Sequence, residues 1–164
     1  MRVTEASFEE CFHEHYARLV ALGVSMTGDH GVARDCAQET FIRAHDRWES
    51  VSAYDRPGAW LRRVMSNLLI DHHRSRSAEL RAVDRLDATT VRTAESPDQP
   101  GDEWDALVAD LPARQRLIVT LFYGHDQSIA DIADVLGVSP NTVKSSLSKA
   151  RTTLRRTLEA RHEH

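Results

Sequence analysis

The sequence is poor in cysteine and has no long apolar run. Its 164 residues include two cysteines, Cys11 and Cys36, too few for a disulfide framework or a four-thiolate zinc site. No apolar stretch approaches the roughly 18 residues that span a membrane, and the first residues lack the apolar core of a secretory signal. With 7 Gly, 5 Pro and 28% charged residues, the composition excludes a fibrous repeat and wholesale disorder. We therefore expect one or two folded domains, a cytoplasmic location and no contact with a membrane.

Charge is unevenly distributed along the chain, although the net charge is only −4. Residues 60–85 and 138–164 carry net charges of +3 and +4, whereas residues 86–110 carry −6. Clustered positive charge, more than total charge, determines non-specific adhesion to nucleic acid. The pattern predicts two separate contacts with nucleic acid, held apart by a negative segment, and weak DNA affinity for the free chain.

Apolar residues recur at helical spacing almost throughout, and no alternating strand pattern is present. The spacing predicts helices near residues 8–26, 32–48 and 57–81, with a loop at 49–56, and further helices beyond residue 104. We predict an all-α chain with two small helical domains, 1–85 and 102–164, joined by an acidic linker at 86–101. The linker composition fits a passive tether equally well.

Residues 128–143 carry the most specific local pattern, that of two helices joined by a tight turn. Ser128 suits a helix cap, Gly137 can take the positive φ of a sharp turn, and Ser139-Pro140 suits the start of a second helix. The exposed face of that second helix carries the short polar groups and cations typical of a major-groove recognition helix: Asn141, Lys144, Ser145, Ser148 and Lys149. The pattern favours a DNA-binding helix-turn-helix over a structural hairpin with a solvated basic face.

A second candidate contact with nucleic acid lies on the helix predicted near residues 57–81. At 100° per residue, Arg63, Asn67 and Arg74 share one face of this helix. Cations beside aromatic rings can bind single-stranded nucleic acid. The candidate residues are Arg62, Arg63, Asn67 and Arg74 on the helix, with Trp48, Tyr54 and Trp60 around its entrance. Taken alone, they fit equally well a helix with Trp60 in the core and solvated arginines.

Three blocks of the sequence together resemble the extracytoplasmic function (ECF) sigma factors of bacterial RNA polymerase. The blocks are residues 33–44 (ARDCAQETFIRA), residues 59–71 (AWLRRVMSNLLID) and residues 111–151, which include GVSPNTVKS. In order and spacing they cover nearly the whole chain outside the predicted linker. The resemblance implies a transcription initiation factor without catalysis of its own, which directs core RNA polymerase to promoter DNA and assists promoter melting.

The resemblance also implies a role for each block. Asp35, Gln38 and Glu39 would dock on the clamp of core RNA polymerase. Asn67 would sit against a base lifted from the melted minus-ten strand, and the loop 48–56 would line a pocket for a second base. The helix that carries residues 141–149 would read the minus-thirty-five duplex, although Ser146 stands where many relatives carry an arginine that contacts phosphate.

Partners and regulation follow from the same resemblance. The acidic linker would thread toward the active-site channel of the polymerase. An anti-sigma factor would cover the polymerase-binding surfaces, and we expect a monomer outside the holoenzyme. Two alternatives to the sigma-factor interpretation remain: a dimeric helix-turn-helix regulator that binds an operator by itself, and an interaction protein that sequesters another factor.

Metal and enzyme chemistry have little support in the sequence. The spacing of Cys11, His13 and His15 does not match a closed zinc site, and the adjacent side chains of Asp71-His72-His73 diverge on a helix. No phosphate-binding glycine loop, nucleophile elbow or triad order is present. We therefore expect no metal, no cofactor and no enzymatic activity.

Overall fold

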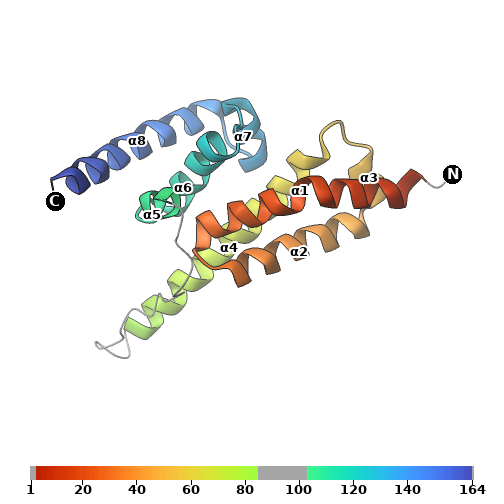
Figure 1. The fold of residues 1–164 in the computed structure, drawn as a ribbon, viewed down its shortest axis with the longest axis horizontal. Helices are drawn as coiled ribbons and strands as arrows, with labels where there is room; N and C mark the ends of the chain where they lie inside the picture. The colour runs from red at the N-terminus through yellow and green to blue at the C-terminus, as the bar shows by residue number, and fades with distance from the viewer. Residues whose placement is uncertain (1–2, 85–102, 164) are drawn as a thin grey trace.

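The structure, a computed structural model, describes residues 3–84 and 103–163, and every regular element within these ranges is helical (Figure 1). The first range holds α1 (Val3–Thr27), α2 (His30–Asp46), α3 (Trp48–Ser52) and α4 (Pro57–Asp84). The second holds α5 (Glu103–Val108), α6 (Ala113–Val119), the π-helical turn η1 (Thr120–Gly124), α7 (Ile129–Leu136) and α8 (Pro140–His162). The all-α prediction is confirmed, whereas the predicted linker at 86–101 lies outside the described residues.

Helices α1, α2 and α4 pack around one apolar core in the first half of the chain. Asp29 caps α2 by accepting hydrogen bonds from the backbone N–H groups of Gly31 and Val32, at 2.8 and 3.2 Å. The inward face predicted for α2 is confirmed, because Ala33, Ala37, Phe41 and Ala44 are all buried. Close contact between α1 and α2 depends on Gly23, since a Cβ there would lie 2.7 Å from that of Ala33.

The segment 49–56, predicted to be a loop, begins with the short helix α3. Trp48 is 8% exposed and meets the ring of Phe8 edge-on, with 5.2 Å between ring centroids. Val51, one helical turn later, is also buried. The i, i+3 spacing of these two side chains therefore fixes a helical turn, because both must point into the same core.

The helix-turn-helix forms as the sequence predicts. The Ser128 hydroxyl accepts the backbone N–H of Asp131 at 3.0 Å, and the Ser139 hydroxyl accepts that of Thr142 at 3.2 Å. Gly137 ends α7 with φ of 65°, the left-handed conformation that the tight turn needs. The buried stripe of α8 consists of Val143, Leu147, Ala150 and Leu154.

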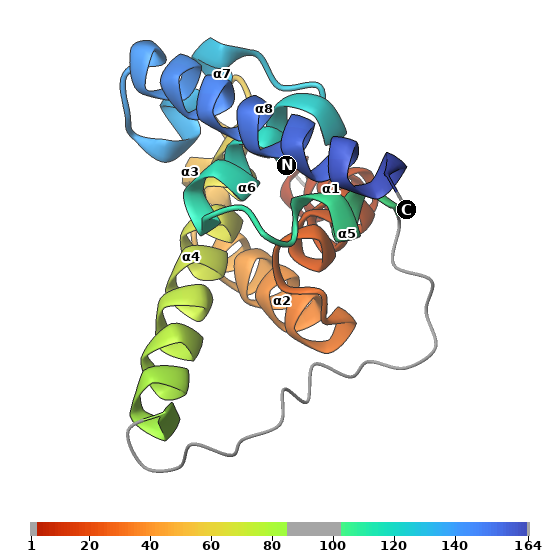
Figure 2. The same cartoon turned by 90° about the vertical axis from the view of Figure 1, so that its left-hand side faces the viewer.

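The two halves of the chain pack against each other, contrary to the expectation that the negative segment holds them apart (Figures 1 and 2). Ser25 of α1 donates a hydrogen bond to the carboxylate of Asp105 in α5 at 2.7 Å, and its carbonyl accepts Nε of Arg116 at 2.5 Å. Arg56, before α4, pairs with Asp131 of α7. Net charge per segment does not reveal these contacts, because individual acids of the second half meet donors of the first.

Helix α4 extends well beyond the core that anchors it. Its 28 residues span about 42 Å at 1.5 Å per residue. Leu61, Met65 and Leu69 are buried, but no residue from Asp71 to Leu80 is buried. Figure 2 shows the second half of α4 projecting from the body of the molecule.

Candidate nucleic-acid and polymerase interfaces

A hollow of about 530 Å³ lies between the end of α2 and the first turns of α4. It brings together four of the predicted nucleic-acid residues, namely Tyr54, Trp60, Arg63 and Asn67. The remaining lining residues are Arg43, Asp46, Arg47 and Val64. We call this feature the α2–α4 hollow. It combines aromatic surface, one carboxamide and three guanidinium groups around one acid, which suits an unstacked base with its phosphate.

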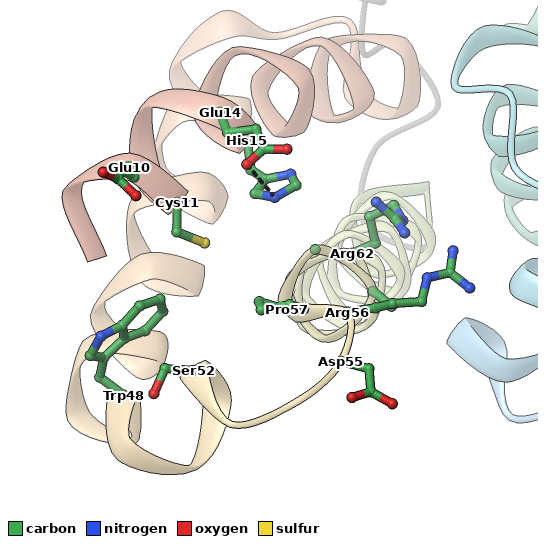
Figure 3. Close-up of a pocket in the computed structure, with 12 residues that line it drawn as sticks. Glu10, Cys11, Glu14, His15, Trp48, Ser52, Asp55, Arg56, Pro57 and Arg62 are labelled. Atoms are coloured by element: carbon green, nitrogen blue, oxygen red, sulfur yellow. Dashed lines mark ion pairs between the residues drawn. The ribbon is translucent and has the colours of Figure 1, made fainter. Parts of the chain in front are cut away.

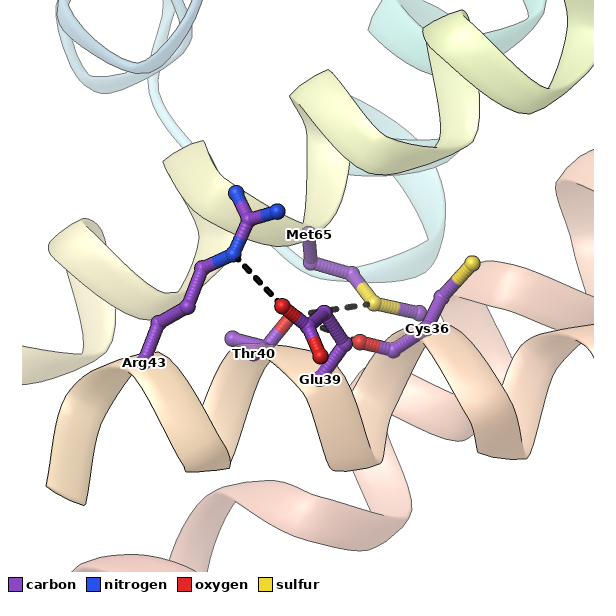
Figure 4. Close-up of polar contacts among 5 residues, drawn as sticks. All are labelled: Cys36, Glu39, Thr40, Arg43 and Met65. Atoms are coloured by element: carbon purple, nitrogen blue, oxygen red, sulfur yellow. Dashed lines mark hydrogen bonds and ion pairs between the residues drawn. The ribbon is translucent and has the colours of Figure 1, made fainter. Parts of the chain in front are cut away.

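Arg43 and Arg47 belong to the hollow but were not predicted from the sequence. They lie on the last turn and C-cap of α2, which crosses the start of α4. Their i, i+4 spacing places both arginines on one face of α2. The sequence does not show that this face borders α4, so the hollow could not be predicted from it. Figure 4 shows Arg43 reaching toward Glu39, with 2.9 Å between Nε and the carboxylate.

Trp48 and Arg62 lie outside the α2–α4 hollow. The Trp48 ring packs in the core against Phe8 and is 8% exposed, so the predicted stacking on a base would require this ring to leave its present packing. Arg62 and Arg56 point toward the second half of the chain, and Arg62 lies near His15 (Figure 3). Arg74 is exposed two turns beyond Asn67, on the projecting part of α4.

The predicted recognition face of α8 is open to solvent. Asn141, Lys144, Ser145, Ser148 and Lys149 are all exposed, and they occupy the first three turns of the helix. Ser146 is half-buried on the flank of this face. Further along α8, Arg151 donates a hydrogen bond to the hydroxyl of Tyr123 at 2.7 Å and lies over the Phe122 ring at 6.0 Å. Packing of the two halves therefore leaves this cationic surface accessible.

The outer face of α2 carries the residues predicted to bind polymerase. Asp35 and Gln38 are exposed, and Glu39 is half-buried and already paired with Arg43. The opposite face is anchored to α4, because the Thr40 hydroxyl, which donates to the carbonyl of Cys36 at 2.8 Å, also contacts Met65 Sδ at 3.7 Å (Figure 4). The half-buried Cys36 fits this position, and burial, followed by the nearby Asp35, raises the pKa of its thiol.

Within residues 3–84 and 103–163, no three His, Cys, Asp or Glu side chains converge as a metal site would require. None of the described helices combines the length and apolarity of a membrane span.

Comparison with known proteins decides the family. The patterns named Sigma-70 region 2 and Sigma-70, region 4 match residues 11–79 and 101–154. The ECF RNA polymerase sigma factor SigL of Mycobacterium tuberculosis is 36% identical over 155 residues, which cover 90% of this chain and 86% of that protein. The chain belongs to the ECF sigma factors. The RNA polymerase sigma-E factor of Streptomyces antibioticus is 32% identical to this sigma factor over 94% of its length and 86% of the relative's.

Solved structures share the fold of this sigma factor. The sigma factor RpoE of Bartonella quintana, in complex with the anti-sigma factor NepR, superposes with a TM-score of 0.74 at 24% identity. That match covers 93% of this chain and 97% of the other. CnrH, in complex with the cytosolic domain of CnrY, gives 0.69 at 23% identity and covers 96% and 91% of the two chains. Family membership makes this protein a factor that directs RNA polymerase to promoters, and the stand-alone operator-binding regulator is not favoured.

Proposed function

We propose that this sigma factor captures the melted minus-ten strand in the α2–α4 hollow, reads the minus-thirty-five duplex with the start of α8 and docks on polymerase through the outer face of α2. The observation that carries the proposal is the convergence of Tyr54, Trp60, Arg63 and Asn67 on one hollow. These residues come from the α3–α4 connection and from α4, so only the fold brings them together.

The chemistry of the hollow supports capture of a single strand. Asn67 offers donors and an acceptor to a base edge, and Trp60 and Tyr54 offer ring surface for stacking. Arg63 and the two α2 arginines supply charge for the adjoining phosphates. A base gains these contacts only when it leaves the duplex, so binding would itself favour the melted state.

The recognition face of α8 supports duplex reading in the same way. Its exposed carboxamide, hydroxyls and ammonium groups lie near the start of the second helix of a helix-turn-helix, where base edges are contacted in a major groove. Asp35, Gln38 and Glu39 complete the proposal as the polymerase contact. The proposal also assigns the two roles to separate domains, residues 1–85 and 102–164, and has the protein act in the cytoplasm as a monomer without catalysis of its own. We further propose that an anti-sigma partner controls it, because two structural neighbours were solved in complex with such a partner or with a cytosolic domain of another protein.

Simultaneous reading of both promoter elements requires the two halves to separate. The names of the elements place them about 25 base pairs apart, or roughly 85 Å along B-DNA. Asn67 lies about 17 Å along α4 from Arg56, and Asn141 lies at most about 25 Å along the chain from Asp131. With Arg56 and Asp131 in contact, Asn67 and Asn141 are at most roughly 55 Å apart. The two halves must therefore separate from this packed arrangement before the chain can bind both promoter elements at once.

Run-off transcription with core polymerase and a genomic promoter library tests the proposal. We expect discrete transcripts that depend on this chain and disappear when the upstream duplex element is deleted. A gel shift without polymerase is the companion measurement. Tight, specific duplex binding by the free chain as a dimer would overturn the proposal in favour of an independent regulator.

A further inference from the structure

A cavity of about 680 Å³ lies between the two halves of the chain. Its walls come from α1 and α4 on one side and from α5, η1 and the connection to α7 on the other. We call it the interdomain cavity. It shares His15 and Arg62 with the smaller pocket of Figure 3, and its volume lies within the range of ordinary small-molecule sites.

Four basic side chains converge on the interdomain cavity: His15 and Arg18 from α1, Arg62 from α4 and His125 from the second half. Burial, followed by the charges of Arg56 and Arg18, lowers the pKa of Arg62. Burial first, with Arg62 and Arg18 contributing, also lowers the pKa values of His15 and His125. The two arginines therefore place positive charge in a partly desolvated place, and the two histidines beside them give up their protons more readily than usual; an anion would be favoured there.

The acids near this cluster offset only part of its charge. Glu14 lies 3.8 Å from His15, but its side chain is 73% exposed. Asp126 lines the cavity as well, and its charge raises the pKa of His125. Asp131 acts in the same direction on the pKa of Arg62, but it is paired with Arg56. Neither Arg18 nor Arg62 has an ion pair with a described residue.

Unpartnered polar atoms point to a ligand more specific than a simple ion. Among the described residues, five buried side-chain polar atoms lack a hydrogen-bond partner, and four of them belong to residues that line this cavity. The four are Arg62 Nε, Trp104 Nε1, Thr120 Oγ1 and Gln127 Oε1. Thr120 is only 1% exposed, so solvent does not satisfy its hydroxyl from outside. A buried polar group without a partner is destabilising. The four atoms have almost no accessible surface, so a ligand with both acceptors and a donor would satisfy them once the side chains that line the cavity shift to admit it.

From this convergence we infer that the interdomain cavity binds a nucleoside polyphosphate. The phosphates lie between Arg18 and Arg62, whose guanidinium groups donate charge-assisted hydrogen bonds, and the two histidines lie beside them with imidazole N–H groups to donate. The base and sugar lie toward Trp104, Thr120 and Gln127, which supply an indole N–H, a hydroxyl and an amide oxygen. A phosphate ion alone would leave the polar atoms of Trp104, Thr120 and Gln127 without hydrogen-bond partners.

The bound nucleotide holds the two halves together, because its contacts come from both. A ligand that binds only the packed arrangement shifts the chain toward it. Given the proposed function, the nucleotide lowers the fraction of chains free to span a promoter. The binding itself does not depend on that function, so it is tested on the free full-length chain.

Isothermal titration calorimetry with ATP, GTP and inorganic pyrophosphate tests the inference, without divalent cations. We expect at least one nucleoside triphosphate to bind one-to-one and more tightly than pyrophosphate. Arg62→Gln and Arg18→Gln should each weaken binding at least tenfold. Trp104→Phe keeps the ring but removes the indole N–H, so it should weaken nucleotide binding several-fold and leave pyrophosphate binding unchanged.

Arg76→Gln and Arg156→Gln are the matched controls, one in each half. Both arginines are exposed, and neither lines the cavity; each control should bind within twofold of the parent protein. Circular dichroism checks the folding of each variant, and the exposed Arg18 keeps the test valid if Arg62→Gln misfolds. Absence of saturable binding, equal losses in the controls, or pyrophosphate binding as tight as that of the nucleotides would overturn the inference.

Discussion

Arg56 and Asp131 connect the two halves of this sigma factor through an ion pair, with 2.5 Å between Nη1 and Oδ1. The hydrogen bond from Arg56 is the main reason that the pKa of Asp131 falls to about 2, and bonds from Ser128 at the start of α7 lower it further. Asp131 therefore takes part in two contacts at once. Its backbone N–H binds the capping hydroxyl of Ser128 at the start of α7, and its carboxylate binds Arg56 in the connection that precedes α4.

Arg56→Gln should increase the fraction of open chains. The ion pair lies at a solvent-exposed position where water and salt screen it, so its loss should raise the open fraction only a few-fold. Single-molecule energy transfer between one dye on each half measures this fraction, with Arg76→Gln as the control. An unchanged distance distribution in Arg56→Gln would show that the pair does not hold the halves together.

Acid should release the same contact. The folded-state pKa of Asp131 is depressed, so its contribution is present above the unfolded value of about 3.9 and disappears as pH falls toward 2. We expect the energy-transfer signal of the parent protein to change in this window, and that of Asp131→Asn to be altered already at neutral pH.

Asn67→Ala should weaken promoter opening more than it weakens polymerase binding. The carboxamide lines the α2–α4 hollow, whose lining includes none of the three residues proposed to contact polymerase. Loss of a base contact costs about 1–3 kcal/mol, or roughly 5- to 150-fold in open complexes. Permanganate footprinting reports opening, and filter binding reports assembly; equal losses in both assays would contradict the assignment of Asn67.

Lys144→Gln and Lys149→Gln should each lower duplex affinity and flatten its dependence on salt. A lysine that neutralises one phosphate contributes about 0.9 to the slope of log K against log salt concentration. Fluorescence anisotropy of the holoenzyme on a minus-thirty-five duplex over a salt series measures both effects. Arg156→Gln serves as the control, and an unchanged slope in either lysine variant would remove that lysine from the interface.

Gly23→Ala should destabilise the first half of the chain. The new methyl group would lie 2.7 Å from Cβ of Ala33 and 2.8 Å from its Cα, so α1 and α2 must move apart. Overpacking costs about 1–3 kcal/mol, partly offset by the better helix propensity of alanine. Thermal unfolding should show a lower midpoint, whereas Gly124→Ala, whose Cβ would have 3.8 Å to Thr120, should remain close to the parent protein.

Mild acid should destabilise the packed form through His15 and His125. Burial is the largest cause of the lowered pKa in both, and Arg62 and Arg18 add to it, whereas Glu14 and Asp126 oppose it. Because the unfolded histidines bind protons first, stability is highest above about pH 6.5 and falls below it, by less than about 1.4 kcal/mol per pH unit for each histidine. The double variant His15→Gln/His125→Gln should show a smaller change of melting temperature between pH 7.5 and 5.5. An unaltered pH dependence would show that these histidines are not the cause of the acid effect.

The sequence predicts those features of this sigma factor that are set by neighbouring residues. The caps at Ser128 and Ser139, the turn at Gly137 and the buried stripe of α8 all depend on local chemistry, and the structure has them as expected. The exposed recognition face of α8 follows directly, because the buried stripe of a helix determines its outer face.

Features that depend on contact between distant segments were missed. Trp48 and Tyr54 looked equivalent as aromatic residues before a basic helix, but Phe8 covers the first and leaves the second 49% exposed. Arg62 and Arg63 are neighbours in sequence but face different cavities, because one residue turns a helix by 100°. Whether either side chain meets solvent, nucleic acid or the other half depends on packing that helical periodicity does not specify.

The projecting half of α4 should unfold locally more easily than the rest of the helix. Between Asp71 and Leu80, backbone hydrogen bonds hold the helix without any buried side chain, and helical segments of this kind open readily in water. Deuterium should therefore enter the amides between Asp71 and Leu80 long before it enters those around Leu61, Met65 and Leu69. Arg74 lies on this projecting part of α4, so its position can adjust to a bound DNA strand. Asn67 lies on the part of α4 that packs on the core, so its position stays fixed.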